Sequence, residues 1–310
     1  MKLLCCILIL ASIFLLPVQS RGGNPFLGRW DLNVTTADAS YPGWMEIVEK
    51  DGKLEGRFQP RGGSVRPASS VAVEGSRLTL TVAPPGGKRP AVVWQVTARD
   101  NQIAGVQKRG ETVLGRFTGT PAPALKRKAP KAWTDPESLF NGKDLTGWEP
   151  DNPATNHWVA RNGVLLNETK GANLRSTRKF DDFKLHIEFN CPEDGNSGVY
   201  LRGRYEIQVE YVPAGREDKY HMMGSIYGYL APAVESPRTP GQWESFDVTL
   251  VGRYVTIARN GIITIDNQEI PGITGAALDS DEGLPGPFYI QGDHTGGMKY
   301  RNITISLPKR

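Results

Sequence analysis

Short runs of alternating apolar and polar residues fill most of this chain, and helical periodicity is poor throughout. Strand alternation places every second side chain on one face of a sheet. Gly, Asn and Asp separate the runs, and Asn260-Gly261 between two apolar runs is the best hairpin signal in the chain. The pattern therefore predicts an all-β protein.

Residues 21–120 contain strand signals at short spacing, such as Ser76–Val82 and Val92–Val96. Alternation separated by Gly and Asp turns indicates an antiparallel meander, so we expect a small β-barrel-like domain. Its opening, Gly28-Arg-Trp, resembles the first strand of lipocalin-like barrels. We interpret this part as an accessory or spacer domain.

Residues 134–310 continue the strand pattern without helices, and this predicts a two-sheet sandwich. The strand candidates are Phe183–Asn190, Gly198–Arg202, Tyr205–Tyr211, Gly224–Tyr229, Glu244–Val251, Tyr254–Arg259, Ile262–Asp266, Pro287–Gln291 and Lys299–Leu307.

Residues 121–133, between these two parts, are rich in Pro and Lys and have almost nothing to bury. We expect a semi-extended, soluble linker there.

The N-terminus has the pattern of a secretory signal. Lys2 precedes an apolar run from Leu3 to Leu16, which is shorter than the roughly 20 residues that a membrane span needs. We expect cleavage after Ser20 and an exported, periplasmic or extracellular protein; an uncleaved anchor is the alternative. Cys191 is then the only thiol of the mature chain, so we expect no internal disulfide.

Charge and motifs exclude several classes of function. The 310 residues carry 37 Lys+Arg against 33 Asp+Glu, and a formal charge of +4 implies no nucleic-acid partner. The chain has no metal-type Cys or His motif, no P-loop and no nucleophile elbow. A membrane span is not expected either.

Polar rows on two strands are the first candidate chemistry. Within residues 205–211, Glu206, Gln208 and Glu210 share one face, and the other face is apolar. Aromatic and Arg residues typical of a sugar groove surround Glu206 and Gln208. For Glu210 alone, a solvated outer face is an equally good interpretation.

A second row, on residues 183–189, contains Lys184, His186 and Glu188. Between the two rows, Asn196–Arg202 is a Gly-containing turn that leads into a strand and delivers Arg202. This Arg could orient Glu206 or Glu188, bind a substrate oxygen, or form a structural ion pair.

His294 is the most interesting of the four His residues, because it follows Gln291 in a Gly-rich loop just past a strand end, where sites tend to lie.

Many segments, in order, resemble the 3-keto-disaccharide hydrolase domain family over about residues 134–308. These segments are Ser138–Trp148, Trp158–Leu165, Phe183–Phe189, Asn196–Arg202, Tyr205–Val209, Gly241–Phe246, Arg259–Gly261, Gly286–Gln291 and Tyr300–Ile303.

The resemblance implies a concanavalin-like jelly roll with a concave sugar-binding sheet. It also implies action on glycosides that are first oxidised at C3. The family's recurring polar residues map onto Glu188, Asn196, Arg202, Glu206, Gln208, Asn260, Gln291 and His294.

The implied chemistry needs a base, an acid and a donor at the keto oxygen. A ketone at C3 acidifies the proton on C2, and the C1 substituent leaves after that proton is removed. Our assignment is Glu206 as base or metal ligand, His294 as acid, and Arg202 with Gln208 at the keto oxygen. Glu188, Asn196, Gln291 and Asn260 are then expected to bind substrate. A divalent ion is possible, but no ligand spacing identifies one.

Two other functions stay open. One is a retaining jelly-roll glycosidase, which needs two carboxylates about 5 Å apart. The other is a non-catalytic carbohydrate-binding module, because fold alone does not fix function. The sequence leaves the oligomeric state open.

Overall fold

The computed structural model describes residues 23–84, 89–211, 218–234 and 237–309. The expected signal, residues 1–20, lies outside the described residues. Strands make up 51% of the structure, and the described residues contain no α-helix, only the 3₁₀ turn η2 (Pro153–Thr155). The all-β prediction is confirmed. Within the described residues, no helix is long and apolar enough to cross a membrane.

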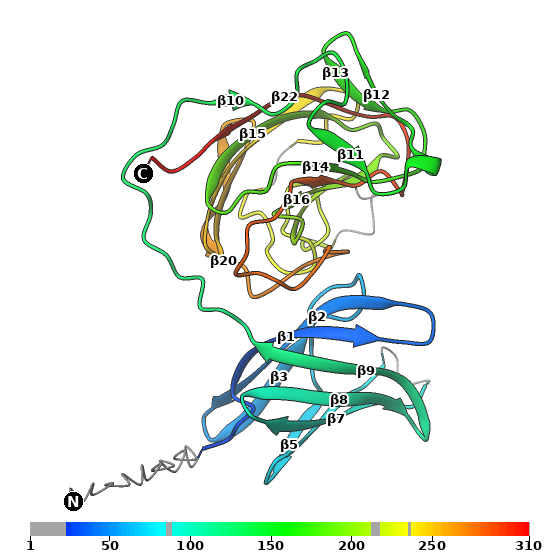
Figure 1. The fold of residues 1–310 in the computed structure, drawn as a ribbon, viewed down its shortest axis with the longest axis vertical. Helices are drawn as coiled ribbons and strands as arrows, with labels where there is room; N and C mark the ends of the chain where they lie inside the picture. The colour runs from blue at the N-terminus through cyan, green and yellow to red at the C-terminus, as the bar shows by residue number, and fades with distance from the viewer. Residues whose placement is uncertain (1–22, 85–88, 212–217, 235–236, 310) are drawn as a thin grey trace, which may run out of the picture.

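One curled antiparallel sheet, here called the N-terminal sheet, forms the first part of the molecule (Figure 1). Its strand order is β4-β3-β2-β1-β9-β8-β7-β6-β5. One apolar face of these strands closes around a core that includes Trp30 and Trp94. The strands are β1 (Gly28–Thr35), β2 (Ser40–Lys50), β3 (Lys53–Phe58), β4 (Arg66–Pro67), β5 (Ser70–Glu74), β6 (Arg77–Val82), β7 (Val92–Arg99), β8 (Gln102–Arg109) and β9 (Thr112–Pro121).

Two further antiparallel sheets pack face to face and form what we call the C-terminal sandwich. The larger sheet has the order β12-β13-β22-β15-β18-β19-β20, with β10 paired to β22. Its strands are β10 (Glu137–Ser138), β12 (Trp158–Arg161), β13 (Val164–Asn167), β15 (Phe183–Asn190), β18 (Trp243–Val251), β19 (Tyr254–Arg259), β20 (Ile262–Glu269) and β22 (Met298–Ser306).

The smaller sheet has five strands in the order β11-β14-β21-β16-β17. One face of it packs on the sandwich core, and the other face carries the candidate site. Its strands are β11 (Trp148–Pro150), β14 (Leu174–Ser176), β16 (Asn196–Leu201), β17 (Tyr205–Glu210) and β21 (Tyr289–Ile290). The predicted jelly-roll sandwich, preceded by a small barrel-like sheet, is therefore confirmed as the fold class.

Of two predictions about single segments, one is confirmed and one is wrong. Asn260 and Gly261 have φ of 51° and 79° and form the predicted turn between β19 and β20. The predicted strand at Gly224–Tyr229 is wrong, because this segment makes turns and only isolated bridges at Ile226. Its backbone groups bond to Tyr220 and, at a few positions only, to β17, so no continuous strand pairing forms.

Most of the Pro-rich segment 121–133 is exposed or partly exposed, and a short part of it packs on the C-terminal sandwich. Leu125 is buried, and its carbonyl accepts a hydrogen bond from Arg253 N. Arg127 forms ion pairs with Asp181 at 2.6 Å and Asp182 at 2.8 Å. One positive charge of the segment, that of Arg127, thus holds it on the sandwich.

Candidate active site

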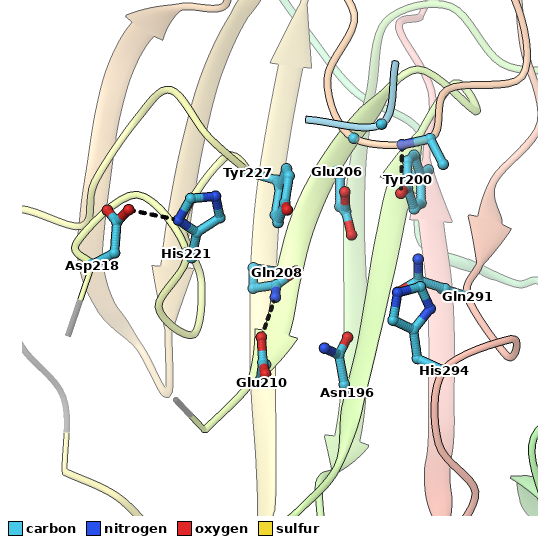
Figure 2. A pocket seen from close by; sticks show the side chains of 13 residues that line it. Asn196, Tyr200, Glu206, Gln208, Glu210, Asp218, His221, Tyr227, Gln291 and His294 are labelled. Carbon is cyan, nitrogen blue, oxygen red and sulfur yellow. Dashed lines mark hydrogen bonds and ion pairs between the residues drawn. The ribbon is translucent and has the colours of Figure 1, made fainter. Parts of the chain in front are cut away.

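The open face of the five-stranded sheet holds a cavity of about 360 Å³ (Figure 2). Most of its lining is polar, and the side chains come from β16, β17, the loop after β21 and the segment 218–227. The cavity is lined by Gly62, Asn196, Tyr200, Glu206, Gln208, Glu210, Asp218, His221, Tyr227, Gly275, Ala276, Gln291 and His294.

Strand register creates this polar surface. β16 and β17 are antiparallel neighbours, and their cross-strand pairs put Tyr200 opposite Glu206 and Asn196 opposite Glu210. The alternate residues, such as Ile207, point into the sandwich core. The polar row predicted for Glu206, Gln208 and Glu210 is therefore one side of the cavity.

Glu206 is buried, with an exposed fraction of 3%. Two glycines make room for its carboxylate: a Cβ on Gly198 or on Gly275 would overlap an oxygen of Glu206. Desolvation by this burial raises the pKa of Glu206 to about 7, and the charges of Asp293 and Glu210 act in the same direction. A carboxylate that titrates near neutrality, held in a cavity, can accept or donate a proton.

Tyr200 is the closest polar neighbour of Glu206 in this packing. Its hydroxyl accepts a hydrogen bond from Ala276 N at 3.1 Å and donates one to the Glu206 carboxylate. This bond lowers the pKa of Glu206 and partly offsets desolvation. Burial, followed by the charge of Glu206, raises the pKa of Tyr200 well above its usual value, so the phenol stays a donor.

His294 forms the opposite wall, and Figure 2 shows its ring pointing into the cavity beside Gln291. Its Nδ1 lies 2.7 Å from Asp293 Oδ1. The Asp293 hydrogen bond raises the pKa of His294, although partial desolvation opposes it, and the charge of Glu206 adds to the increase. Asn173 Oδ1 accepts hydrogen bonds from Gly292 N and Asp293 N and fixes this loop.

Two buried amide oxygens in the cavity lack a partner. Gln208 Oε1 and Gln291 Oε1 accept no hydrogen bond from the part of the chain that the structure describes, whereas Gln208 Nε2 donates to Glu210 Oε2 at 2.7 Å. An unsatisfied buried acceptor is costly, so each oxygen would gain from a ligand that brings donors. Sugar hydroxyl groups are such donors. Asn196 adds a further amide to the same wall.

A second histidine, which sequence reasoning ranked low, also lines the cavity. His221 Nδ1 lies 2.8 Å from Asp218 Oδ2, and its Nε2 lies 2.7 Å from Ser64 Oγ of the N-terminal sheet's β3–β4 loop. His221 and Tyr227 make an edge-to-face ring contact. No local signal marks this pair, because Ser64 and His221 are 157 positions apart in the sequence.

Five of the eight candidate residues line this one cavity, and their roles stay predictions: Glu206, His294, Gln208, Asn196 and Gln291. Sequence reasoning missed Tyr200, Asp218, His221, Tyr227 and the glycine-containing loops at 62 and 275–276. Tyr200 lies on β16 opposite Glu206, so strand alternation together with the register of the two strands could have found it.

Arg202 does not line the cavity, which corrects its expected place at the keto oxygen. Its side chain is fully buried and reaches Asp181 at 3.1 Å, Tyr205 Oη at 2.9 Å and the Gly252 carbonyl at 2.8 Å. The reason is local: Arg202 follows the last residue of β16 with φ of 55°, so strand alternation no longer applies to it. Arg202 instead belongs to a buried ionic network.

Glu188 and Asn260 also lie outside the cavity. Glu188 is on β15, in the other sheet, and accepts hydrogen bonds from Arg301 and Asn302. Asn260 is in the β19–β20 turn and donates to Glu244 at 3.0 Å. Both residues make contacts that hold neighbouring strands and turns, and neither is placed beside Glu206.

Metal ligation receives no support from the described ranges, which contain no group of three or more His, Cys, Asp or Glu residues able to hold a metal ion. The possible divalent ion stays a prediction.

The fold and this polar cavity define a carbohydrate-active jelly-roll protein. The family described as the 3-keto-alpha-glucoside-1,2-lyase-like domain matches residues 135–306, more than half of the chain. The protein therefore belongs to this family, as the sequence motifs indicated. No curated protein matches the chain.

Solved structures resemble the same part of the chain. A presumed glycosyl hydrolase from Parabacteroides distasonis is 26% identical, with a TM-score of 0.49 over 58% of this chain and 92% of that one. A second from the same organism is 20% identical, with a TM-score of 0.45 over 55% and 92%. β-Agarase A from Zobellia galactanivorans is 11% identical, with a TM-score of 0.34 over 60% and 97%.

Proposed function

We propose that the C-terminal sandwich cleaves 3-keto-glycosides by removing the C2 proton and releasing the C1 substituent. The observation that carries the proposal is Glu206, a buried cavity carboxylate whose pKa is raised to about 7. Membership of the 3-keto-alpha-glucoside-1,2-lyase-like family supports the substrate class. The unpartnered oxygens of Gln208 and Gln291 support a ligand rich in hydroxyl groups.

In this mechanism, ionised Glu206 takes the C2 proton, and the C–H electron pair forms an enolate with the C3 carbonyl. The enolate then collapses, a C1–C2 double bond forms and the C1–O bond breaks. Protonated His294, paired with Asp293, gives its proton to the departing oxygen. The products are an unsaturated 3-keto sugar and a free alcohol; addition of water to the double bond gives the hydrolysis product.

Neutral donors take the role first assigned to Arg202. The amide groups of Asn196 and Gln291 line the cavity next to His294 (Figure 2). Preorganised donors stabilise an enolate oxygen without a full positive charge. The base and the acid are the same residues as in the sequence prediction, whereas the groups at the keto oxygen differ from it.

The retaining-glycosidase alternative needs a second carboxylate about 5 Å from Glu206. Glu210, on the same face of β17, is the candidate partner. Gln208 lies between them and is bonded to Glu210.

Incubation with a 3-keto disaccharide and with its unoxidised parent, each with and without chelator, tests the proposal. We expect loss of the ketone substrate only. Cleavage of both sugars would favour the retaining glycosidase, and binding of both without turnover would favour the carbohydrate-binding module; either result rejects the proposal. Chelator sensitivity would indicate a metal requirement.

We also propose that residues 1–20 are a cleaved signal and that the protein is exported, with parts at 21–120, 121–133 and 134–310. The N-terminal pattern of Lys2 and a short apolar run supports export. N-terminal sequencing of protein from the periplasm or medium is expected to start at Arg21. A start at Met1 in a membrane fraction would reject cleavage.

A further inference from the structure

One loop contacts the candidate base directly. Residues 272–276, here called the backing loop, lie between β20 and β21 and touch Glu206 from outside the sheet. Thr274 Oγ1 accepts a hydrogen bond from Glu206 N at 2.8 Å, and Ala276 N donates to the Tyr200 hydroxyl that bonds Glu206. Gly275 leaves no space for a Cβ beside the carboxylate. The loop therefore sets how tightly Glu206 is enclosed.

The N-terminal sheet holds this loop on its other side. Gln59 Nε2 donates to the Gly275 carbonyl at 3.0 Å, and Trp44 Nε1 donates to the Ile273 carbonyl at 2.9 Å. Both side chains are buried, with exposed fractions of 4% for Gln59 and 1% for Trp44. The Trp44 ring also packs so closely on Gly272 that a Cβ there would lie 2.7 Å from it. The backing loop is thus fixed between the two parts of the molecule.

A second contact reaches the other end of the cavity. Gly62 of the N-terminal sheet's β3–β4 loop is part of the cavity lining, and Ser64 Oγ lies 2.7 Å from His221 Nε2. Because Asp218 takes the other ring nitrogen, the two partners together fix the orientation and tautomer of His221. Gly228 packs against Ser64, where a Cβ would collide with its backbone.

We propose that the N-terminal sheet is one wall of the active site, in which Gln59 positions Glu206 through Gly275 and Ser64 positions His221. This replaces the expected accessory or spacer role. The catalytic part of the proposal rests on the proposed function, whereas the positioning itself does not. Neither residue contacts the reacting atoms, so both are positioning residues.

The physical consequence is a coupling between the two parts of the chain. Without the Gln59 amide, the Gly275 carbonyl loses its buried partner and the backing loop relaxes toward water. Water that reaches Glu206 reduces the desolvation that now dominates its titration. Glu206 would then titrate closer to an ordinary glutamate and be a weaker base.

The first test is a ¹³C NMR titration of glutamate side chains in the full chain, with E206Q to assign the signal. We expect Gln59→Met to lower the pKa of Glu206 by about one unit and to reduce kcat about tenfold, with KM nearly unchanged. Arg29→Met is the matched control: it breaks a contact to Glu269 between the same two parts, at 2.6 Å, away from the backing loop. An unchanged Glu206 titration in Gln59→Met, or the same shift in Arg29→Met, overturns the proposal for Gln59.

The second test uses ¹⁵N spectra of the four His rings, with H221Q to assign His221. We expect Ser64→Ala to change the tautomer ratio of His221 and to leave His186 unchanged. Ser64 is half-buried in the β3–β4 loop, so this variant is expected to fold even if Gln59→Met does not. Unchanged His221 signals would overturn the role of Ser64.

Turnover by the unmodified protein separates the two proposals. If it cleaves no 3-keto disaccharide but both spectra change as expected, the proposed function fails and the positioning holds.

Discussion

Two strands of the C-terminal sandwich carry the same alternation of polar and apolar residues, and they end in different environments. On β17, Glu206 lies in the cavity, and burial raises its pKa to about 7. On β15, partial burial opposes ionisation of Glu188, but hydrogen bonds from Asn302 and Arg301 outweigh it and lower its pKa. The side chains alone do not distinguish the two rows. The distinction comes from what covers each sheet face: the backing loop over β17, and solvent with Arg301 and Asn302 over β15.

The largest effect expected from this comparison is on turnover. Glu206→Gln removes the base and is expected to reduce turnover of a 3-keto disaccharide about 1000-fold, the middle of the range for general base catalysis. The matched change on the other strand, Glu188→Gln, is expected to leave the rate within about twofold. Steady-state kinetics on both variants measures the contrast, and equal losses would show that the two strands do not differ in function.

The pH dependence of the unfolding free energy of Glu206→Gln gives a second comparison between the two strands. The folded-state pKa of Glu206 is raised from 4.5 to about 7, so its contribution to stability is fully present below about pH 4.5 and is lost as pH rises through 7. Glu206→Gln removes this penalty. We expect its stability advantage over the wild type to grow by about 3 kcal/mol between pH 4 and pH 8, from a shift of about 2.5 pH units.

Urea unfolding at the two pH values measures this difference. Glu188→Gln is again the control, and it should show the opposite sign, because the pKa of Glu188 is lowered. A pH-independent difference for Glu206→Gln would contradict the burial of its charge.

The pH–rate profile separates base from acid. Activity is expected to rise as Glu206 loses its proton near pH 7 and to fall as His294, whose pKa is raised by the Asp293 hydrogen bond, loses its own. His294→Gln should reduce the rate about 100-fold and abolish the falling limb while the rising limb stays. His186→Gln, on β15, is the matched variant and should keep both limbs. Loss of the rising limb in His294→Gln would reverse the assignment.

The smallest expected effect comes from the space beside the carboxylate. Gly198→Ala places a Cβ against the Glu206 side chain and should displace it, with a loss of about tenfold in kcat and little change in Tm. Gly283→Ala is the control, because its nearest neighbours lie at ordinary van der Waals distances. Equal kinetics for the two variants would show that the carboxylate tolerates displacement.

The alternation on residues 205–211 was enough to predict the cavity face, since strand geometry alone decides which side chains share a face. It failed for Arg202, because a left-handed residue directly after β16 turns the side chain away from the row. It also failed for Glu188, because alternation says that a face is polar and not which sheet forms the cavity.

The contacts of Gln59 and Ser64 could not be predicted from the sequence, for a different reason. Gln59 is 216 positions from Gly275, and Ser64 is 157 positions from His221, so no local pattern connects them. The pairs exist only because one sheet folds against another. Residues 21–120 were interpreted as a spacer because these long-range contacts to the C-terminal sandwich leave no local pattern in the sequence.

Trp44 illustrates what this arrangement means for any attempt to divide the protein. Its indole fills a recess formed by Ile273 and Ala277, and all three are buried. A chain cut at residue 134 would expose that recess to water, and the backing loop would lose its hydrogen bonds to the N-terminal sheet. A chimera that joins the C-terminal sandwich of one relative to the N-terminal sheet of another would then fold only if both Trp44 and its recess come from the same protein.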